Sequence, residues 1–585
     1  MSEPPIDAVA DGPAKRPLLK RAKFWIPAGI LLVLIVGGVA TAVAGKAVAD
    51  QAFATRDALK QAIPLATAAK DQVTAGDATA AQATVAELQE LTAKARADSD
   101  GSLWRLAEGI PVAGANLTAV RTVAETVDKL VTDAVAPAST LSLESLAPVG
   151  GRIDTSAVTA ASAVVDEIAV AVADARTALD GLDRTGLMPE VAEGVAQLDD
   201  AVAQIEPVIE PAQKALAVLP GLLGAEGARN YLVLVQNNAE SRGTGGNPAA
   251  LVMIHVDDGA ISIARQASSG DFQNGRPTPI VGLDPATVAL YGDKVGRYMQ
   301  DVTTTPDFAE SARIMGAFWA ESIGTPIDGT LSIDPVALSY LLVATGPVTM
   351  PNGDVLDSSN AVSMLLNQVY FRYSDPAAQD AYFAAAASAV FDALTSVQQP
   401  RALVEQVVRA VDEGRILYVP TSTAEAEIIA GSRLTGILPA DNTEVTMVGS
   451  YVNDVTEGKL DYYMDTAVSV TSDVCEVAAD VAPTFQVDTT LTSILQPGDV
   501  PGLALYISPA NYFPRGVVST DLVVYGPVGA SIVSASVDGV AVAPIVVEHL
   551  GRPAAKLNIV NQPGASHAVS VVFSGTAGAA YGPRS

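Results

Sequence analysis

The chain has 585 residues, more than one hydrophobic core normally serves, so we expect several domains. Its 65 acidic and 35 basic residues give a formal net charge of −30, which repels phosphate backbones and argues against nucleic acid as a partner. Cys475 is the single cysteine, which excludes an intrachain disulfide. The three histidines lie far apart in the sequence and do not have the spacing of metal ligands.

An uncharged run covers residues 24–45. A helix of this length crosses a hydrocarbon core of about 30 Å, and basic residues just before it are typical of a cytoplasmic flank. We therefore predict a cytoplasmic tail over residues 1–23, a transmembrane anchor in the lipid bilayer over 24–45, and an extracellular bulk at the cell membrane. The alternative is a cleaved secretion signal, because small residues at 40–44 match the pattern that signal peptidase accepts. Both interpretations export the protein. The basic residues before the run are Lys15, Arg16, Lys20, Arg21 and Lys23.

Residues 46–224 have the residue spacing of helices. Apolar residues recur every three or four positions from Val191 to Ile209, and a second apolar stripe runs from Val120 to Ala134. Asp77 follows a glycine and is placed to cap the next helix. The pattern predicts an antiparallel helical bundle or stalk next to the membrane.

Residues 225–435 alternate between strand and helix signals, which predicts an α/β core. Asp258-Gly259 joins two apolar runs and is typical of a hairpin turn. Thr305 is expected to cap a helix with Pro306 in its first turn, and Asp334-Pro335 starts another helix. Strands are predicted at 231–236, 250–256, 260–267, 331–333 and 416–419, and further helices at 359–371, 376–396 and 400–413.

Residues 440–585 consist mostly of β-branched runs separated by Gly, Pro and Asp. Runs of strand length at this spacing predict a β-sandwich, with an immunoglobulin-like domain as the candidate. The predicted strands are 467–471, 484–491, 517–525, 530–537, 541–547 and 568–573.

The polar segment 236–247 directly follows a predicted strand and contains three glycines. Its backbone N–H groups could line an anion site, and Arg242 could clamp a phosphate with two hydrogen bonds. The alternative is a tight connection in which Arg242 pairs with a neighbouring acid such as Glu240. No Gly-Lys-Ser/Thr follows, so the segment is not a Walker A loop. Its candidate ligand-binding residues are Asn237, Asn238, Glu240, Arg242, Thr244, Gly245 and Gly246.

A second group of candidates lies at and beside the Gly/Ser/Pro-rich loop 268–279. Arg265 and Asp271 are candidate ligand-binding residues there, with Arg276 nearby; the alternative is a solvated loop. No Ser/His/Asp arrangement, paired-carboxylate signature or cofactor fingerprint stands out, so the catalytic residues stay unknown and no metal site is predicted.

The segment 453–463 is a third candidate. Lys459, Asp461 and the tyrosines at 462 and 463 offer a sugar-binding or docking surface. The alternative is a turn leading into a strand, with the tyrosine rings packed and their hydroxyls bonded.

Several of these motifs resemble those of a bacterial family of membrane-anchored proteins, domain of unknown function 4012. The resemblance covers roughly residues 50–575 and implies an envelope protein with no assigned biochemistry. It rests on the segment 236–247, Thr-Pro-Asp-Phe at 305–308, Asp-Gly-Thr-Leu-Ser-Ile-Asp-Pro at 328–335, Ala-Thr-Gly-Pro-Val at 344–348, and the segment 453–463.

A fainter resemblance is to the LytR-CpsA-Psr phosphotransferases, which attach lipid-linked glycopolymers to peptidoglycan. Arg242 and Arg265 stand where that family has arginines that bind pyrophosphate. Thr244 and Gln266 stand where it has acids that help to hold Mg²⁺. Because phosphoryl transfer depends on such charge neutralisation, the missing acids argue against an enzyme.

The sequence therefore predicts a multidomain α+β protein: a transmembrane helix, a helical bundle or stalk, an α/β core similar to the LytR-CpsA-Psr fold, and a C-terminal β-sandwich. The leading hypothesis is a binding or scaffolding component of surface polysaccharide or wall assembly, with cell-wall or capsular glycan and envelope proteins as partners. The second is a phosphotransferase or hydrolase on polyprenyl-pyrophosphate-linked glycans, which would use Mg²⁺; otherwise no cofactor is expected. The third is an adhesion or protein-interaction ectodomain.

Overall fold

The computed structural model describes residues 45–110, 113–141, 146–478 and 480–582. The predicted tail and residues 24–44 of the predicted anchor lie outside the described residues. Contacts divide the chain into two compact units, Met1–Leu143 with Ala157–Ala217 and Glu144–Ser156 with Val218–Ser585. The predicted domain boundaries near residues 224 and 440 stay predictions.

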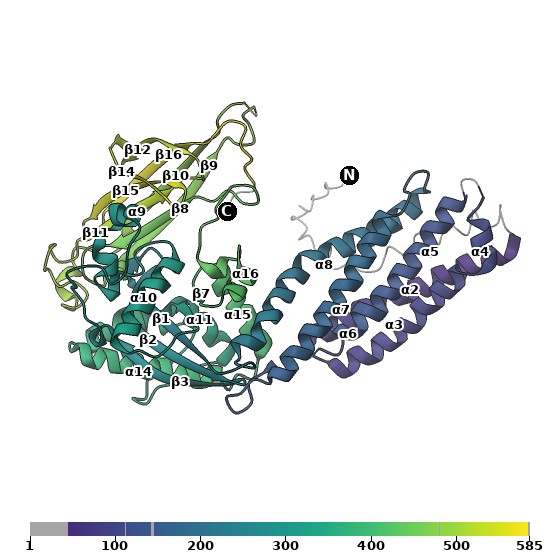
Figure 1. Cartoon of the computed structure of the whole chain (residues 1–585), viewed down its shortest axis with the longest axis horizontal. Coiled ribbons are helices and arrows are strands. Elements are labelled where there is room, and N and C mark those ends of the chain that lie inside the picture. The colour runs from purple at the N-terminus through teal and green to yellow at the C-terminus, as the bar shows by residue number, and fades with distance from the viewer. Residues whose placement is uncertain (1–44, 111–112, 142–145, 479, 583–585) are drawn as a thin grey trace, which may run out of the picture. The chain divides into compact units, whose positions relative to one another are not determined.

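The first unit consists of long helices that lie side by side (Figure 1). The sequence-based prediction of helices in this region is confirmed. Asp77 caps α3, because its side chain accepts a hydrogen bond from the N–H of Ala80 at 3.0 Å. The main helices are α2 (Gly45–Ala75), α3 (Ala78–Ser99), α4 (Ser102–Ala107), α5 (Ala113–Leu130), α7 (Thr155–Asp180) and α8 (Pro189–Leu222).

The core of this unit contains both apolar stripes that the sequence shows. Val191, Val195 and Val202 of α8 are buried in one cluster with Val120 and Val123 of α5. Side chains that repeat every three or four residues share one face of a helix, so each stripe can pack continuously against its neighbours.

By length and composition, α7 is apolar enough to cross a membrane. Val172 and Leu179 on this helix are buried in the same cluster, and Arg176 pairs with Glu206 on α8 at 2.9 Å. These contacts are typical of a helix that packs within a bundle.

The second unit is built on a five-stranded sheet with the order β3-β2-β1-β4-β7. The β1–β4 pair is parallel, and the other three pairs are antiparallel. The chain is thus mixed α and β, as predicted, but the specific likeness to the LytR-CpsA-Psr fold is not confirmed. The strands are β1 (Arg229–Arg242), β2 (Gly245–Asp257), β3 (Ala260–Ser268), β4 (Gly329–Ile333) and β7 (Leu417–Pro420).

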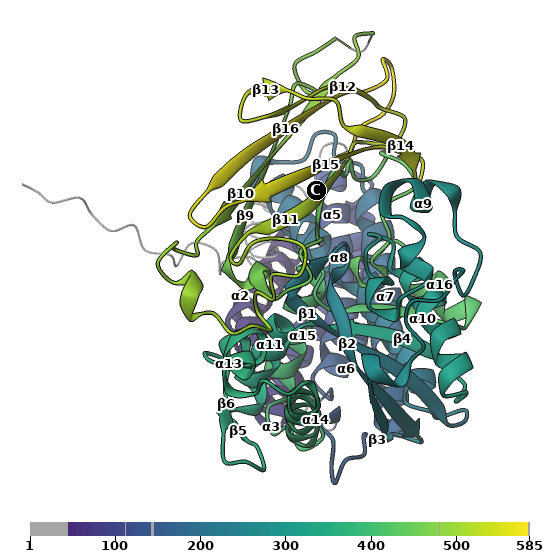
Figure 2. The same cartoon turned by 90° about the vertical axis from the view of Figure 1, so that its left-hand side faces the viewer.

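Helices lie along this sheet (Figure 2). α11 (Pro335–Thr345) begins at Pro335 with Asp334 as its cap, as predicted. The other principal helices are α9 (Pro285–Tyr291), α10 (Phe308–Ser322), α14 (Pro376–Leu394), α15 (Pro400–Asp412) and α16 (Thr423–Ile429), with α12 (Ala361–Ser363) and α13 (Val369–Arg372) flanking a short π-helical turn.

Two local predictions for this unit have different outcomes. Asp258 and Gly259 adopt φ of 45° and 76° in the β2–β3 turn, which is the left-handed geometry predicted for the hairpin. The predicted cap of α10 is wrong: Asp307, not Thr305, accepts from the N–H of Ala309 at 2.9 Å. Pro306 therefore precedes the cap.

The C-terminal strands form two further sheets, ordered β13-β12-β16-β10-β9 and β14-β15-β11-β8. Figure 2 shows them stacked, and their facing side chains share one buried cluster that includes Phe485, Leu522 and Val571. Two strands were not predicted, β8 and β15, because Pro553, Lys556 and Asn558 interrupt the apolar pattern of β15 and β8 has few apolar residues. The strands are β8 (Gly449–Asp454), β9 (Met464–Ser472), β10 (Thr484–Ser493), β11 (Val518–Tyr525), β12 (Ser531–Val537), β13 (Val540–Ala541), β14 (Ile545–His549), β15 (Arg552–Asn561) and β16 (Ser566–Ser574).

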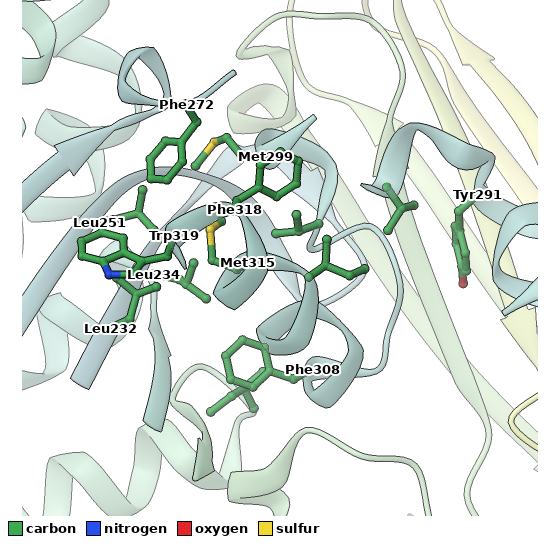
Figure 3. Close-up of a cluster of buried hydrophobic side chains, with 14 of the residues drawn as sticks. Leu232, Leu234, Leu251, Phe272, Tyr291, Met299, Phe308, Met315, Phe318 and Trp319 are labelled. Atoms are coloured by element: carbon green, nitrogen blue, oxygen red, sulfur yellow. The ribbon is translucent and has the colours of Figure 1, made fainter. Parts of the chain in front are cut away.

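β11 is buried on both of its faces. Leu522 and Val524 point into the cluster between the two C-terminal sheets, whereas Val523 and Tyr525 join the cluster around α10. Figure 3 shows part of that second cluster, with Phe318 and Trp319 of α10 against the strands. Successive residues of a strand point to opposite faces, so β11 joins the β-rich end to the α/β part in one compact unit.

Candidate functional site

The polar segment 236–247 forms the tip of a long hairpin. β1 continues to Arg242 and β2 begins at Gly245, so only Gly243 and Thr244 connect them. A Cβ at Gly243 would lie 2.3 Å from the carbonyl oxygen of Thr304. The tip therefore packs directly on the backbone before α10, and a glycine is needed at this close approach.

Backbone donors at the tip already have internal acceptors. The N–H of Gly243 donates to Oδ1 of Asn453 at 3.0 Å, and the N–H of Thr244 donates to the carbonyl of Thr303 at 3.0 Å. Gly246, the next expected anion donor, also donates within the chain. An anion could bind these groups only by displacing existing hydrogen bonds.

Gly245 and the two asparagines have structural contacts in the hairpin. Gly245 adopts a φ of 139°, which favours glycine. Asn237 donates to the hydroxyl of Tyr370, and Asn238 donates to Oδ2 of Asp334 at 3.1 Å. These contacts connect the tip to α13 and to the cap of α11.

A buried ionic network surrounds Arg242. Its Nη2 lies 2.7 Å from Oε1 of Glu240 and 3.4 Å from Oδ1 of Asp301. Its Nη1 donates to the carbonyls of Ser241 at 3.0 Å and Asp454 at 3.2 Å. The alternative interpretation from the sequence, in which Arg242 pairs with Glu240, is therefore the arrangement that the structure has.

Glu240 is shared between two cations. Its Oε2 contacts the ammonium of Lys459 and accepts from Nδ2 of Asn247 at 2.9 Å. Burial opposes ionisation of Glu240, but Lys459 and Arg242 outweigh it and lower its pKa to about 2. Burial likewise opposes the charge on Arg242 and Lys459, yet Glu240 raises the pKa of both. All three groups are therefore charged at neutral pH.

Two more acids, Asp454 and Asp461, lie beside this network. Asp454 is 3% exposed, and its Oδ1 accepts from the N–H of Thr456 at 2.7 Å. Oδ2 of Asp461 accepts from the N–H of Ser241 at 2.8 Å. Burial and the nearby Asp454 raise the pKa of Asp461 to about 7, and burial with Glu240 raises the pKa of Asp454. The two acids therefore resist being ionised together.

Lys459 also connects the network to two stacked rings. Its ammonium lies 6.0 Å from the ring centre of Tyr370 and 5.6 Å from that of Tyr506. The two rings are nearly parallel, with centres 5.3 Å apart and an interplanar angle of 10°. Tyr370 is buried, whereas Tyr506 is 40% exposed.

The structure does not bring the second group of candidates to this site. Arg242 on β1 pairs with Gly245 of β2, and Arg265 on β3 pairs with Met253 of β2. Gly245 and Met253 are eight residues apart along β2. At about 3.3 Å per residue, this separation is roughly 25 Å along the strand. Arg265 is exposed, and Asp271 is an exposed residue whose carboxylate accepts from the N–H of Ser268.

Gln266, which stands in place of an expected acid, lines a surface groove of about 690 Å³ between β3, β5 (Val348–Thr349) and α14. Its amide donates to the carbonyl of Ala384 at 3.2 Å and to Oγ of Ser388 at 3.1 Å. In the part of the chain that the structure describes, no three His, Cys, Asp or Glu side chains are placed to hold a metal ion.

The segment 453–463 is brought to the hairpin tip, although more than 200 residues separate the two in sequence. Asn453, Asp454, Lys459 and Asp461 all contact residues 240–243 or their backbone. The sequence shows both polar segments, but nothing in it pairs them. Asp301, the remaining acid of the network, ends a short 3-10 helix, Met299–Asp301, which has no recognisable sequence motif, and it was not predicted.

Residues 226–370 match a family described as "Protein of unknown function (DUF4012)". No curated protein matches the chain. The matched residues contain the hairpin tip and Asp301, whereas the segment 453–463 that completes the network lies beyond them. Over residues 226–370, the chain is therefore similar to this family of unknown function, DUF4012.

Proposed function

We propose that this chain is a single-pass, extracytoplasmic envelope protein that acts as a binding or scaffolding component of surface polysaccharide or wall assembly. The observation that carries the non-catalytic part of this proposal is the burial of Arg242. Its side chain is 7% exposed, and its charge is neutralised by Glu240 and Asp301. A pyrophosphate at this position would have to displace both acids and pay to desolvate its own charge.

The separation of the arginines supports the same conclusion. A pyrophosphate clamp requires cationic groups that converge on one anion. Arg242 is buried at the hairpin tip, and Arg265 is exposed roughly 25 Å away along the sheet. The phosphotransferase alternative is therefore the weaker of the two.

The proposed location in the cell envelope rests on the sequence. The uncharged run 24–45 and the basic residues before it favour an anchor with the bulk of the chain outside the cell. Protease added to intact cells should digest the chain beyond residue 46, and inverted vesicles should protect it. The opposite pattern would reverse the topology and remove the envelope proposal.

A candidate glycan surface lies on the loop between β10 and β11. Tyr506 is fixed by its stack on Tyr370 and still exposes 40% of its surface, and Tyr512 in the same loop is 72% exposed. Rigid, exposed aromatic rings with a polar hydroxyl bind amphipathic partners at a small entropic cost, and a sugar ring is such a partner.

Binding assays with the full-length protein separate the two functions. For a scaffold, we expect co-sedimentation with purified cell-wall glycan that falls at least tenfold in Tyr506→Ala and Tyr512→Ala, while Val533→Ala, on an exposed strand elsewhere, binds as the parent does. We expect no Mg²⁺-dependent binding of a polyprenyl pyrophosphate. Saturable, Mg²⁺-dependent binding that Arg265→Ala abolishes would instead establish the enzyme alternative, because Arg265 is exposed and its loss should not disturb folding.

A further inference from the structure

The free edge of β9 is unlike the other edges of the C-terminal sheets. Native edge strands are normally short, covered, charged or interrupted, because an open edge pairs with other strands. β13 has only two residues, α9 lies over β14, and β8 contacts the hairpin tip of β1. β9 has nine residues, pairs with β10 alone and continues without a bulge from Met464 to Ser472.

The side chains of β9 leave this edge unprotected. Asp465 is the single charged residue of the strand, which contains no lysine, arginine or proline. Every residue from Asp465 to Thr471 is exposed. Beyond Asp465 near its start, the strand therefore has neither a charge nor a proline, the features that usually block pairing.

In the part of the chain that the structure describes, two valines on the inner face of β9 are exposed. Val468 and Val470 pair in register with Thr489 and Val487, which are each 1% exposed, yet the valines are 50% and 37% exposed. The facing sheet stops short of them, because its last strand, β8, lies opposite β10: Ser450 hydrogen-bonds Thr489 at 2.7 Å. The apolar surface of Val468 and Val470 therefore extends past the edge of the facing sheet.

We propose that β9 is a self-association strand, which pairs antiparallel with β9 of a second copy of this chain about a twofold axis. Side chains on the inner face of one β9 must lie opposite side chains on the inner face of the other. This condition is met when Val468 lies opposite Val468 of the second copy, which places Thr466 opposite Val470. Asp465 then faces Thr471. A shift that places Ser469 opposite itself would set Asp465 against Asp473, a repulsive pair.

The chosen register keeps the like charges of the two strands apart. The two Asp465 carboxylates are six residues apart along the paired strands, roughly 20 Å, which exceeds the Debye length of about 8 Å at physiological salt. The same strand on both sides gives a closed, isologous contact that does not continue into fibres.

The size of the contact predicts its strength. Nine residues per copy are fewer than the roughly 20–30 per side of a standard interface. The dimer is therefore weak and concentration-dependent, and it depends on backbone pairing with a small apolar contribution. This inference is independent of the glycan proposal, because the Tyr506 surface is not part of the strand.

Sedimentation velocity of the full-length protein over a wide concentration range tests the proposal. The expected result is a reversible monomer–dimer equilibrium whose Kd rises at least tenfold in Val468→Lys. Val533→Lys, at a valine of β12 that is 61% exposed, should leave the Kd unchanged. A protein that stays monomeric throughout, or a Kd that Val468→Lys does not change, overturns the proposal.

Cysteine cross-linking gives a second measurement that does not require a destabilising variant. Cys475 is exposed and is first replaced by serine. On this background, Val468→Cys places two sulfurs opposite each other at a Cα separation of about 4.5–5.5 Å, within disulfide range. Ser469→Cys lies on the other face of β9. In the same register the two substituted residues are diagonal neighbours, with Cα atoms more than about 7 Å apart, beyond disulfide range. Faster disulfide dimerisation of Val468→Cys supports the register, and equal rates contradict it.

Discussion

Replacing Glu240 by glutamine removes the carboxylate that Arg242 and Lys459 share. Glu240→Gln keeps the shape of the side chain but leaves two buried cations with less compensation. Breaking a buried ion pair from one side typically costs about 3–5 kcal/mol, because the remaining charge stays buried.

The pKa of Glu240 gives a second measure of the same quantity. Its lowering from 4.5 to about 2 corresponds to roughly 3 kcal/mol of stability at neutral pH. Because this pKa is depressed in the folded protein, the contribution is complete above pH 4.5 and is lost as the pH falls towards about 2. Glu240→Gln should therefore destabilise the protein at pH 7 and have a flatter stability profile over that acid range.

Hydrogen exchange of the β1 and β2 peptides in increasing urea gives the free energy of opening for this region alone. The matched control is Glu405→Gln, which removes one partner of an exposed pair, Arg401–Glu405, and should cost less than about 0.5 kcal/mol. If Glu240→Gln costs no more than the control, the network is hydrated and does not hold the hairpin tip to the segment 453–463. Arg242 would then be available to a ligand.

Two further substitutions test the same region. Asp461→Asn should stabilise the protein at pH 8 by roughly 4 kcal/mol, because burial and Asp454 raise the pKa of Asp461 from 3.8 to about 7. A raised carboxyl pKa means that stability falls as the pH rises from about 4 to 7, so the advantage of asparagine should shrink in urea titrations towards pH 4; a constant advantage would contradict this. Gly243→Ala should cost about 1–3 kcal/mol, because its Cβ meets the carbonyl of Thr304 at 2.3 Å, whereas Gly316→Ala on α10 has open space and should lower neither Tm nor urea midpoint.

Local structure was largely predictable from the sequence. The Asp77 cap, the Asp258-Gly259 turn and the helix start at Asp334-Pro335 depend on residues within four positions of one another. The prediction for Thr305 was wrong because Asp307, two residues later, is an equally good cap, and the packing of Thr305 in the interior decides between them.

The sequence by itself determined the charge balance, the helical and β-rich regions and the two polar segments, because periodicity and turn chemistry are local properties. Tertiary structure alone decided that the segment 453–463 meets residues 240–243 and that Arg265 does not. It also decided that β11 is buried on both faces and that β9 ends a sheet without cover. The physical reason is that such contacts depend on which faces of distant elements bury each other, and a strand pattern shows which residues share a face without showing what that face will meet.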